Sequence, residues 1–558
     1  MWSEDKRSKT SSAPHLSTTS TGDPRLNPSE TLPESSASST ASEPRLLKPT
    51  VIWFAVAVLA IIVLYARLLH LSFDGDYQGW ASASCMTMAH SFNQLGALHT
   101  HFVPIQNNLP LGSDPDVYLH WPPLFPLLLS FVTRILGNHE SSGRLFALAI
   151  TLATACVVIA IARRLYGTQT ALLAGFFFLT ARATFEGGRA VLHQPLAMFF
   201  GSATVLLFLM AIDTQLLLPR RRLFAVLGLL AIICSMLTAW DPAFIPLGLL
   251  ISSIYLRRRD AARLAALYLI AGILTFIAVQ ADYILAYPQL FKNQFATIAY
   301  RAGLNFNASS STRLHTIVDQ VHYLSGRFSF FGTISHIFRW TFWSFDTFSL
   351  LAAFLFLASW LQSNRRQNTA AVYILGGLCL PWLLFYAIMN NYVGMHPFAL
   401  VLATPFLAIA SGFVLDRIWS FLNAAIGDHR QYLRVMIVIF PLIILYPLLT
   451  NIRDAKVPDE PPQFQDLSSI IERNTPPNAV TLSPAESAVP VYYSNRHVVR
   501  GIATLDLLRL AIPQARADFP GSPLFFALRD TDRAYFTEIP PQLTPITRLG
   551  DSTIYAIP

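Results

Sequence analysis

Charged residues are scarce in this chain: Asp, Glu, Lys and Arg together make up 13% of its 558 residues, whereas hydrophobic residues make up 53% and the mean hydropathy is +0.44. Soluble domains carry about 25% charged residues, so the composition excludes an ordinary soluble enzyme and predicts a polytopic membrane protein. The formal net charge of +8 comes from short basic clusters between apolar segments. Such clusters set membrane topology, and no nucleic-acid-binding motif accompanies them.

Cysteine is also rare. The spacing of the four cysteines allows neither a disulfide framework nor a metal cluster, and no internal repeat of solenoid or propeller length is present. The sequence therefore predicts no obligatory cofactor and leaves a divalent metal open.

Three regions differ in composition. Residues 1–48 are rich in Ser, Thr, Pro and Glu and lack the apolar core of a signal peptide, so we expect a disordered tail. Residues 49–451 are dominated by apolar segments. Residues 452–558 have the composition of a small soluble α/β domain, with strands expected at 479–482, 498–499, 524–528 and 553–557 and helices at 464–473 and 505–517. For this domain we expect a packing or acceptor-docking role.

The apolar segments predict an α-helical membrane domain with about eleven spans. Basic clusters fall at every second span boundary, which places the N-terminal tail in the cytoplasm and the loops 71–144 and 288–344 and the C-terminal domain on the other side. We expect an integral protein of a bacterial inner (plasma) membrane. The Pro-led segment 122–136 is short, and we interpret it as an interfacial or re-entrant helix. The expected spans are 51–69, 145–162, 170–183, 195–212, 223–239, 242–256, 263–285, 347–362, 370–389, 397–415 and 434–450.

Two carboxylates, Asp74 and Asp76, lie at the mouth of the first span. A charge at this depth is costly unless it faces water or a polar pocket, so the pair is a functional hypothesis. The alternative is a solvated turn, because Asp-Gly is a common turn dipeptide.

Several motifs occur together in one order along the first half of the chain. They resemble the N-terminal half of GT-C glycosyltransferases of the protein-mannosyltransferase and aminoarabinose-transferase type (glycosyltransferase family 39). The motifs are Asp74-Gly75-Asp76, Met88-Ala89-His90-Ser91-Phe92, His120-Trp121-Pro122-Pro123, Gly143-Arg144-Leu145, Gly188-Arg189-Ala190-Val191-Leu192-His193-Gln194-Pro195 and Trp240-Asp241-Pro242.

The resemblance implies a glycosyltransferase that moves a sugar from a polyprenyl- or dolichyl-phosphate donor to an acceptor on the outer face. An outer carboxylate can take the proton from the acceptor hydroxyl, so Asp76 is the expected general base and Asp74 the alternative. Asp76 lies nearer the following helical segment and is expected to be better held. Asp74 leaves the span directly and is expected to stay solvated.

The leaving phosphate needs cations and hydrogen-bond donors. The loop 288–344 supplies Lys292, Arg301, Arg313, Arg327 and Arg339, of which we single out Arg301 and Arg313; attraction to acidic lipid headgroups is the alternative role.

Two arginines at span ends, Arg144 and Arg189, are further candidates, although they could instead snorkel or pair with Glu140 and Glu186. The remaining substrate-binding candidates are three histidines beside prolines and two acidic residues within or beside the motifs: His120, His193, His396, Glu186 and Asp241.

Two rivals come from other classes: a secondary transporter and a non-catalytic membrane scaffold. Transporters often show matching halves and ionisable groups at the bilayer midplane, whereas the polar candidate residues of this chain lie at the outer ends of the spans.

The Trp-Trp-Asp motif expected of an oligosaccharyltransferase is absent from the outer domain, which favours transfer of a single sugar. The sugar is open, and so is the acceptor: protein Ser/Thr, a glycolipid, a cell-wall glycan or a second lipid-linked sugar.

Overall fold

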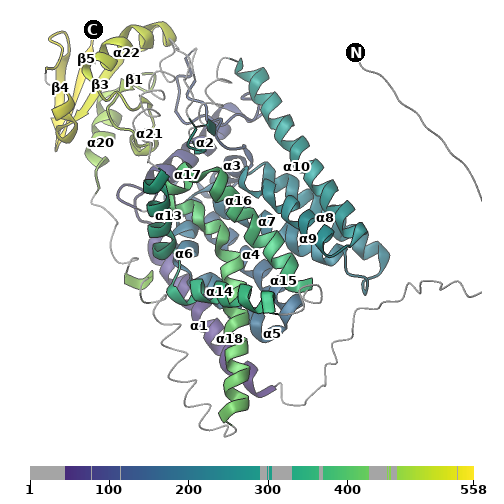
Figure 1. The fold of residues 1–558 in the computed structure, drawn as a ribbon. Coiled ribbons are helices and arrows are strands. Elements are labelled where there is room, and N and C mark those ends of the chain that lie inside the picture. Colours follow the sequence, from purple (N-terminus) through teal and green to yellow (C-terminus); the bar gives the residue numbers. More distant parts are fainter. Residues whose placement is uncertain are drawn as a thin grey trace, which may run out of the picture. The chain divides into compact units, whose positions relative to one another are not determined.

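The computed structural model describes residues 44–76, 78–112, 115–288, 298–299, 301–304, 330–362, 369–426, 449, 451–453, 462–536 and 538–558. Residues from Lys48 to Pro558 form one compact unit, mostly of helices with a small sheet near the C-terminus (Figure 1). The expected tail lies almost wholly outside the described residues, as does nearly all of the expected span 434–450.

Every other expected span is helical, because long apolar segments satisfy their backbone polar groups internally only as helices. Four spans are composite: the expected span 170–183 is broken at Ala181 between α5 and α6, a 3-10 turn leads into α9, a π-helical turn joins α15 to α16, and a 3-10 segment precedes α18. The membrane-domain helices are α1 Pro44–Leu68, α2 Gly79–Leu95, α3 Leu124–Leu136, α4 Glu140–Tyr166, α5 Thr168–Thr180, α6 Arg182–Arg189, α7 His193–Ala211, α8 Leu218–Met236, η1 Asp241–Ala243, α9 Phe244–Tyr255, α10 Arg259–Ala286, α13 Phe330–Ser344, α14 Thr347–Gln362, α15 Thr369–Ile374, η3 Leu375–Cys379, α16 Leu380–Ile388, α17 Asn390–Met395, η4 Pro397–Ala403 and α18 Thr404–Ile426.

Within the described residues, five helices are long and apolar enough to cross a membrane, or six if α13 and α14, which meet at 105°, count as one span. The chain is an integral membrane protein. Helix α3 packs on α2 and α4. At 13 residues it is about 20 Å long, short of the about 30 Å of a bilayer core. Its re-entrant position stays a prediction.

The C-terminal domain is built on a five-stranded sheet of order β2-β1-β3-β5-β4. Strands β1, β2 and β3 are parallel, and β5 runs antiparallel to both β3 and β4. The expected strands and helices are present; β4, whose residues are mostly exposed, and the short helix α21 are additional. The elements are α20 Gln465–Asn474, β1 Val480–Leu482, α21 Val489–Ser494, β2 His497–Val499, α22 Leu505–Asp518, β3 Leu524–Arg529, η5 Asp530–Tyr535, β4 Thr544–Leu549 and β5 Ser552–Ile557.

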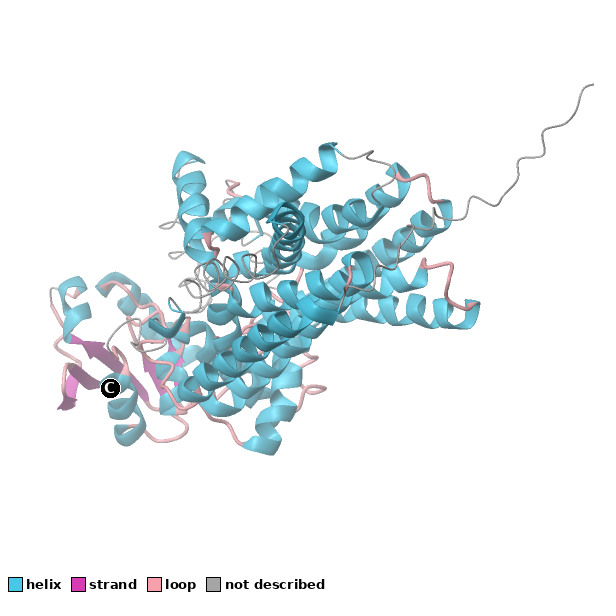
Figure 2. Ribbon diagram, turned by 90° about the horizontal axis from the view of Figure 1, so that it is seen from below, coloured by secondary structure: helices cyan, strands magenta, loops and turns pink. Residues whose placement is uncertain are grey.

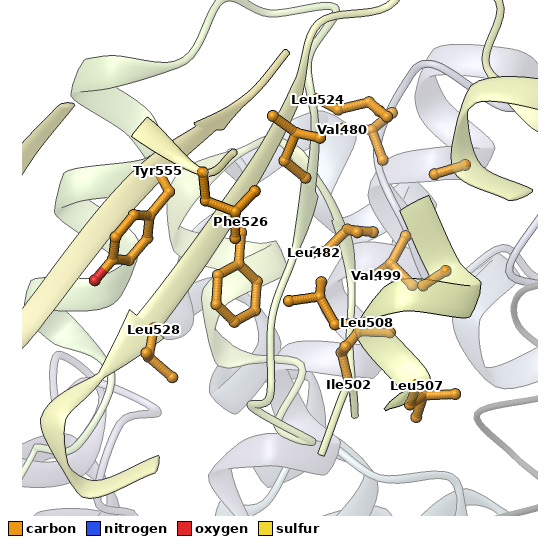
Figure 3. Close-up of a cluster of buried hydrophobic side chains, with 14 of the residues drawn as sticks. Val480, Leu482, Val499, Ile502, Leu507, Leu508, Leu524, Phe526, Leu528 and Tyr555 are labelled. Atoms are coloured by element: carbon orange, nitrogen blue, oxygen red, sulfur yellow. The ribbon is translucent and has the colours of Figure 1, made fainter. Parts of the chain in front are cut away.

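This sheet has its own apolar core on the face covered by α22. Leu482, Val499, Leu508 and Phe526 are each fully buried there and pack together (Figure 3). Figure 2 shows the strands confined to one side of the helical body. The domain therefore carries its own core and meets the helices through a separate surface.

That surface is formed chiefly by α21, which packs on α2. Ala488 and Val489 join a buried cluster that contains Phe73, Met86 and Phe125 of the membrane domain.

The loop between α2 and α3 adds polar contacts. The Asn107 side chain donates to the Val498 carbonyl at 2.8 Å and accepts the Val498 N–H at 2.9 Å, so it pairs with edge strand β2 as another strand would. Asn108 Nδ2 donates to the Val491 carbonyl at 2.8 Å.

Candidate active site

The turn that joins α1 to α2 places Asp76. Gly75 has φ 82°, in the left-handed region that glycine adopts without strain. The Asp76 N–H donates to the Phe73 carbonyl at 3.2 Å, and a Cβ added to Gly79 would lie 1.7 Å from the Phe73 oxygen. The two glycines thus allow a tight reversal that holds Asp76 just before α2.

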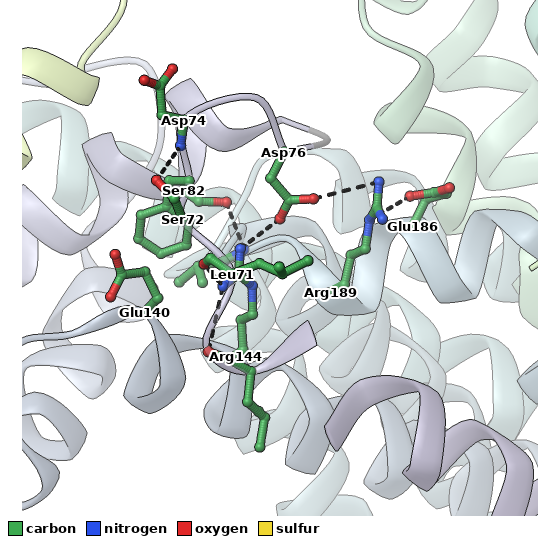
Figure 4. A network of polar contacts seen from close by, with 12 residues as sticks. Leu71, Ser72, Asp74, Asp76, Ser82, Glu140, Arg144, Glu186 and Arg189 are labelled. Carbon is green, nitrogen blue, oxygen red and sulfur yellow. Dashed lines mark hydrogen bonds and ion pairs between the residues drawn. The ribbon is translucent and has the colours of Figure 1, made fainter. Parts of the chain in front are cut away.

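The Asp76 carboxylate lies between two buried arginines (Figure 4). Its Oδ2 is 2.6 Å from Arg144 Nη2, and its Oδ1 is 3.6 Å from Arg189 Nη2. Arg189 Nε also lies 2.7 Å from Glu186 Oε2. The four side chains are between 1% and 7% exposed. Two carboxylates thus face two buried guanidinium groups, which offset their charge, and the half-buried Arg182 adds a third guanidinium, with its Nε 3.9 Å from Glu186 Oε1.

Arg144 fastens the same turn to the end of α1. Its Nη1 donates to the Leu71 carbonyl, and its guanidinium carbon lies 4.9 Å from the centre of the Phe73 ring. Arg144 lies one turn into α4 and Arg189 ends α6, so three elements converge on Asp76. The expected alternative of an Arg189–Glu186 pair is present, whereas Arg144 pairs with Asp76 and not with Glu140.

The expectation that Asp74 stays solvated is wrong. Asp74 is 5% exposed, and its carboxylate accepts the backbone N–H groups of Gln463 at 3.0 Å and Phe464 at 2.7 Å. These N–H groups lie at the start of α20, where a carboxylate satisfies unpaired helix donors and the helix dipole favours a negative charge. Asp74 is thus bound to the C-terminal domain, while Asp76 belongs to the arginine cluster.

A second contact between this domain and the turn comes from Tyr493. Its hydroxyl accepts the Phe73 N–H at 2.8 Å, lies 2.9 Å from Ser72 Oγ and donates to Glu140 Oε1 at 2.5 Å. Asp74 and Tyr493 therefore hold both sides of the turn that carries Asp76.

A second cluster surrounds Arg301. Its guanidinium carbon lies 5.0 Å from the ring centres of both Trp121 and Tyr392. Together with His120 and Asp241 these residues line a cavity of about 30 Å³, which has room for water but not for a sugar ring. Asp241 is fully buried, and neither of its carboxylate oxygens has a hydrogen-bond partner among the described residues.

The other two histidines belong to this cluster. The His193 ring stacks at 4.5 Å from Trp121, and the His396 ring lies 4.9 Å from Tyr392 and 6.3 Å from Trp80. Trp121 is 4% exposed, so it is buried in protein.

The two clusters are neighbours along the chain. Trp80 follows Asp76 by four residues, and His193 follows Arg189 by four. The structure brings the singled-out residues into two groups. Asp76, Arg144, Glu186 and Arg189 form the first, and His120, His193, Asp241, Arg301 and His396 belong to the second. Of the basic loop residues, Arg339 is exposed on α13 beside Trp340, and Lys292, Arg313 and Arg327 lie outside the described residues.

Sequence reasoning missed three residues. Tyr392 and Tyr493 have no motif around them, and Gln194, which donates to the Tyr392 hydroxyl at 2.9 Å, follows His193 within a motif that already pointed to it. In the described part of the chain, no group of three or more His, Cys, Asp or Glu residues is placed to hold a metal ion.

Comparison with known proteins supports the fold. Residues 120–283 match the family model described as dolichyl-phosphate-mannose-protein mannosyltransferase. The fold is similar to that of ArnT from Cupriavidus metallidurans bound to undecaprenyl phosphate, with a TM-score of 0.62 and 15% identity over 92% of this chain and 98% of that one. The chain has a GT-C-like fold.

The fold is also similar to that of the archaeal oligosaccharyltransferase AglB from Archaeoglobus fulgidus, solved with an inhibitory peptide and a dolichol-phosphate. That match has a TM-score of 0.55 and 11% identity over 85% of this chain and 69% of AglB. No curated protein sequence matches the chain.

Proposed function

We propose that the protein transfers a single sugar from a polyprenyl-phosphate donor to an acceptor hydroxyl on the extracytoplasmic face of a bacterial inner membrane. The observation that carries this proposal is the buried Asp76 carboxylate, held between Arg144 and Arg189 beside the Arg301 cluster. The lipid phosphates bound by the similar structures, undecaprenyl phosphate in ArnT and dolichol-phosphate in AglB, support a lipid-linked donor.

Asp76 is the general base in this mechanism. The two arginines hold the carboxylate in position, one at each oxygen. One of its oxygens accepts the acceptor proton as the acceptor oxygen bonds to the anomeric carbon. The bond between that carbon and the phosphate oxygen breaks, and the phosphate leaves with the electron pair. A single displacement inverts the anomeric configuration relative to the donor.

Arg301 is the donor-binding cation. Its guanidinium lies over two aromatic rings, which is a geometry that leaves N–H groups at its edge for a phosphate. Asp241, His120, His193 and His396 surround it and are suited to sugar hydroxyls. Because the cavity beside Arg301 has room for no more than water, donor binding requires the side chains that line it to separate.

The test replaces Asp76 with Asn, which cannot take the proton. We expect transfer from a lipid-linked sugar to fall about 10²- to 10⁴-fold, the usual contribution of a general base. Asp116→Asn is the matched control, because it also removes a largely buried carboxylate that is paired with an arginine, Arg500, outside both clusters. Both variants should lose thermal stability, and only Asp76→Asn should lose transfer. Full transfer by Asp76→Asn would disprove the assignment.

A further inference from the structure

A larger cavity, of about 330 Å³, lies where the C-terminal domain meets the membrane domain. Its walls come from α2, from Asn108 in the loop between α2 and α3, from the connection between α3 and α4 with the first residue of α4, and from α21 with the residue that follows it. Neither domain encloses it alone. Domain interfaces are common places for small-molecule sites, and this volume lies at the lower end of their range of about 300–1,000 Å³.

The residues that line this cavity are all polar or carry a polar group. Two of the nine, Tyr492 and Tyr493, are aromatic. They offer amide groups such as those of Asn138 and Asn495, imidazoles such as His90, and the Glu140 carboxylate. Amides and a carboxylate beside aromatic rings suit a ligand with many hydroxyl groups on a ring that also has apolar faces.

The charges of the lining residues also indicate that the ligand of this cavity is not an anion. It contains one carboxylate and neither Lys nor Arg. Burial lowers the pKa of His90 below its usual value, which disfavours the charged form of this ring. The second imidazole of the lining, His139, has its Nδ1 2.8 Å from Ser142 Oγ. A phosphate would meet Glu140 with no guanidinium or ammonium group to balance its charge. This cavity is therefore chemically unlike the Arg301 cluster, and the lipid-phosphate donor does not fit it.

The cavity is connected to the turn that carries Asp76. Tyr493, in its wall, accepts the Phe73 N–H, and the Phe73 carbonyl accepts the Asp76 N–H at 3.2 Å. Glu140, also in the wall, lies one helical turn before Arg144, which binds Asp76. A ligand in this cavity would therefore contact the residues that hold the base.

We propose that this cavity binds a neutral sugar unit of the acceptor, so that the acceptor is a glycan or glycolipid and not a protein side chain alone. The inference rests on the proposed function, since it names the acceptor class for that transfer. The bound unit would anchor the acceptor while another of its hydroxyls reaches Asp76.

The test measures binding of neutral methyl hexosides to the full-length protein in lipid nanodiscs, by saturation-transfer NMR. Nanodiscs are needed because the headgroup of a maltoside detergent would compete. We expect saturable binding of at least one methyl hexoside and no competition from inorganic phosphate. His90→Phe, which fills the cavity, should weaken binding at least tenfold. His99→Phe, the same change at an exposed histidine of the loop after α2, should not.

A second variant guards against misfolding. Asn495 has φ 49°, so Asn495→Gly removes the amide without straining the backbone, and it should also weaken hexoside binding. Absence of hexoside binding, competition by phosphate, equal binding in both cavity variants and wild type, or capture of a Ser/Thr peptide instead would each overturn the proposal.

Failure of the proposed function gives a different pattern. Asp76→Asn should bind hexosides normally. If it also transfers sugar normally, the base assignment fails while the cavity assignment stands. If the Asp76→Asn variant transfers no sugar and the wild-type protein binds no hexoside, only the cavity assignment fails.

Discussion

The Asp74 carboxylate accepts the backbone N–H of Phe464 at 2.7 Å, although 390 residues separate them along the chain. The contact binds the start of the first C-terminal helix to the loop that carries the proposed base. The C-terminal domain is thus connected to that loop as well as packed on α2.

Replacement of Asp74 by Asn should loosen this connection. An amide can accept one of the two N–H groups, but its own NH₂ group then faces the other. We expect a loss of about 1.5–3 kcal/mol, the range for a hydrogen bond to a charged group. Faster amide hydrogen exchange at Gln463 and Phe464 would report it, and transfer should fall less than in Asp76→Asn. Asp506→Asn, at an exposed position of α22, is the control. Unchanged exchange at both amides would contradict the prediction.

Replacement of Tyr493 by Phe should release the other side of the turn. The Phe73 N–H and the Glu140 carboxylate would each lose a partner, at a cost of about 1–3 kcal/mol. Exchange at the Phe73 amide should accelerate. Tyr492→Phe is a close control, because the Tyr492 hydroxyl makes a single long, exposed contact, 3.4 Å from the Asn138 carbonyl. Equal exchange in the two variants would show that Tyr493 does not hold the turn.

Removal of the Arg301 side chain should weaken donor binding. If its guanidinium binds the donor phosphate, Arg301→Ala should reduce the affinity for polyprenyl phosphate by about 1.5–3 kcal/mol, roughly 10- to 150-fold. Arg339→Ala removes an exposed arginine that lies over its neighbour Trp340, and it should leave affinity unchanged. Equal loss in both variants would point to general attraction for acidic lipid headgroups instead.

Membrane orientation can be tested with two equally exposed positions. The side chains of Asp506 in the C-terminal domain and Asp260 at the start of α10 are both 90% exposed. In a cysteine-free background, a membrane-impermeant thiol reagent added outside should label Asp506→Cys and not Asp260→Cys. The reverse result would place Asp76 on the cytoplasmic side and exclude the proposed donor scheme.

Local sequence was enough to predict the long apolar helices and most of the C-terminal strands. Helix α13 was missed because it lies in the segment interpreted as an outer loop. A long apolar segment in lipid has almost no alternative to a helix, so composition alone placed α4, α7 and α10. Strand β4 was missed because its residues are mostly exposed and lack the alternation of a half-buried strand. Helix α21 was missed because it is only six residues long and begins with Val489-Pro490.

The sequence by itself determined which residue types were available for chemistry, and their order along the chain already grouped most of the candidates. Only the tertiary structure decided their partners. Local position ranked Asp76 above Asp74 as the base but gave no partner for either: Asp74 binds N–H groups of α20, while Asp76 binds arginines from α4 and α6. The physical reason is that a buried carboxylate needs donors to offset its lost hydration, and these donors come from segments that only folding brings close.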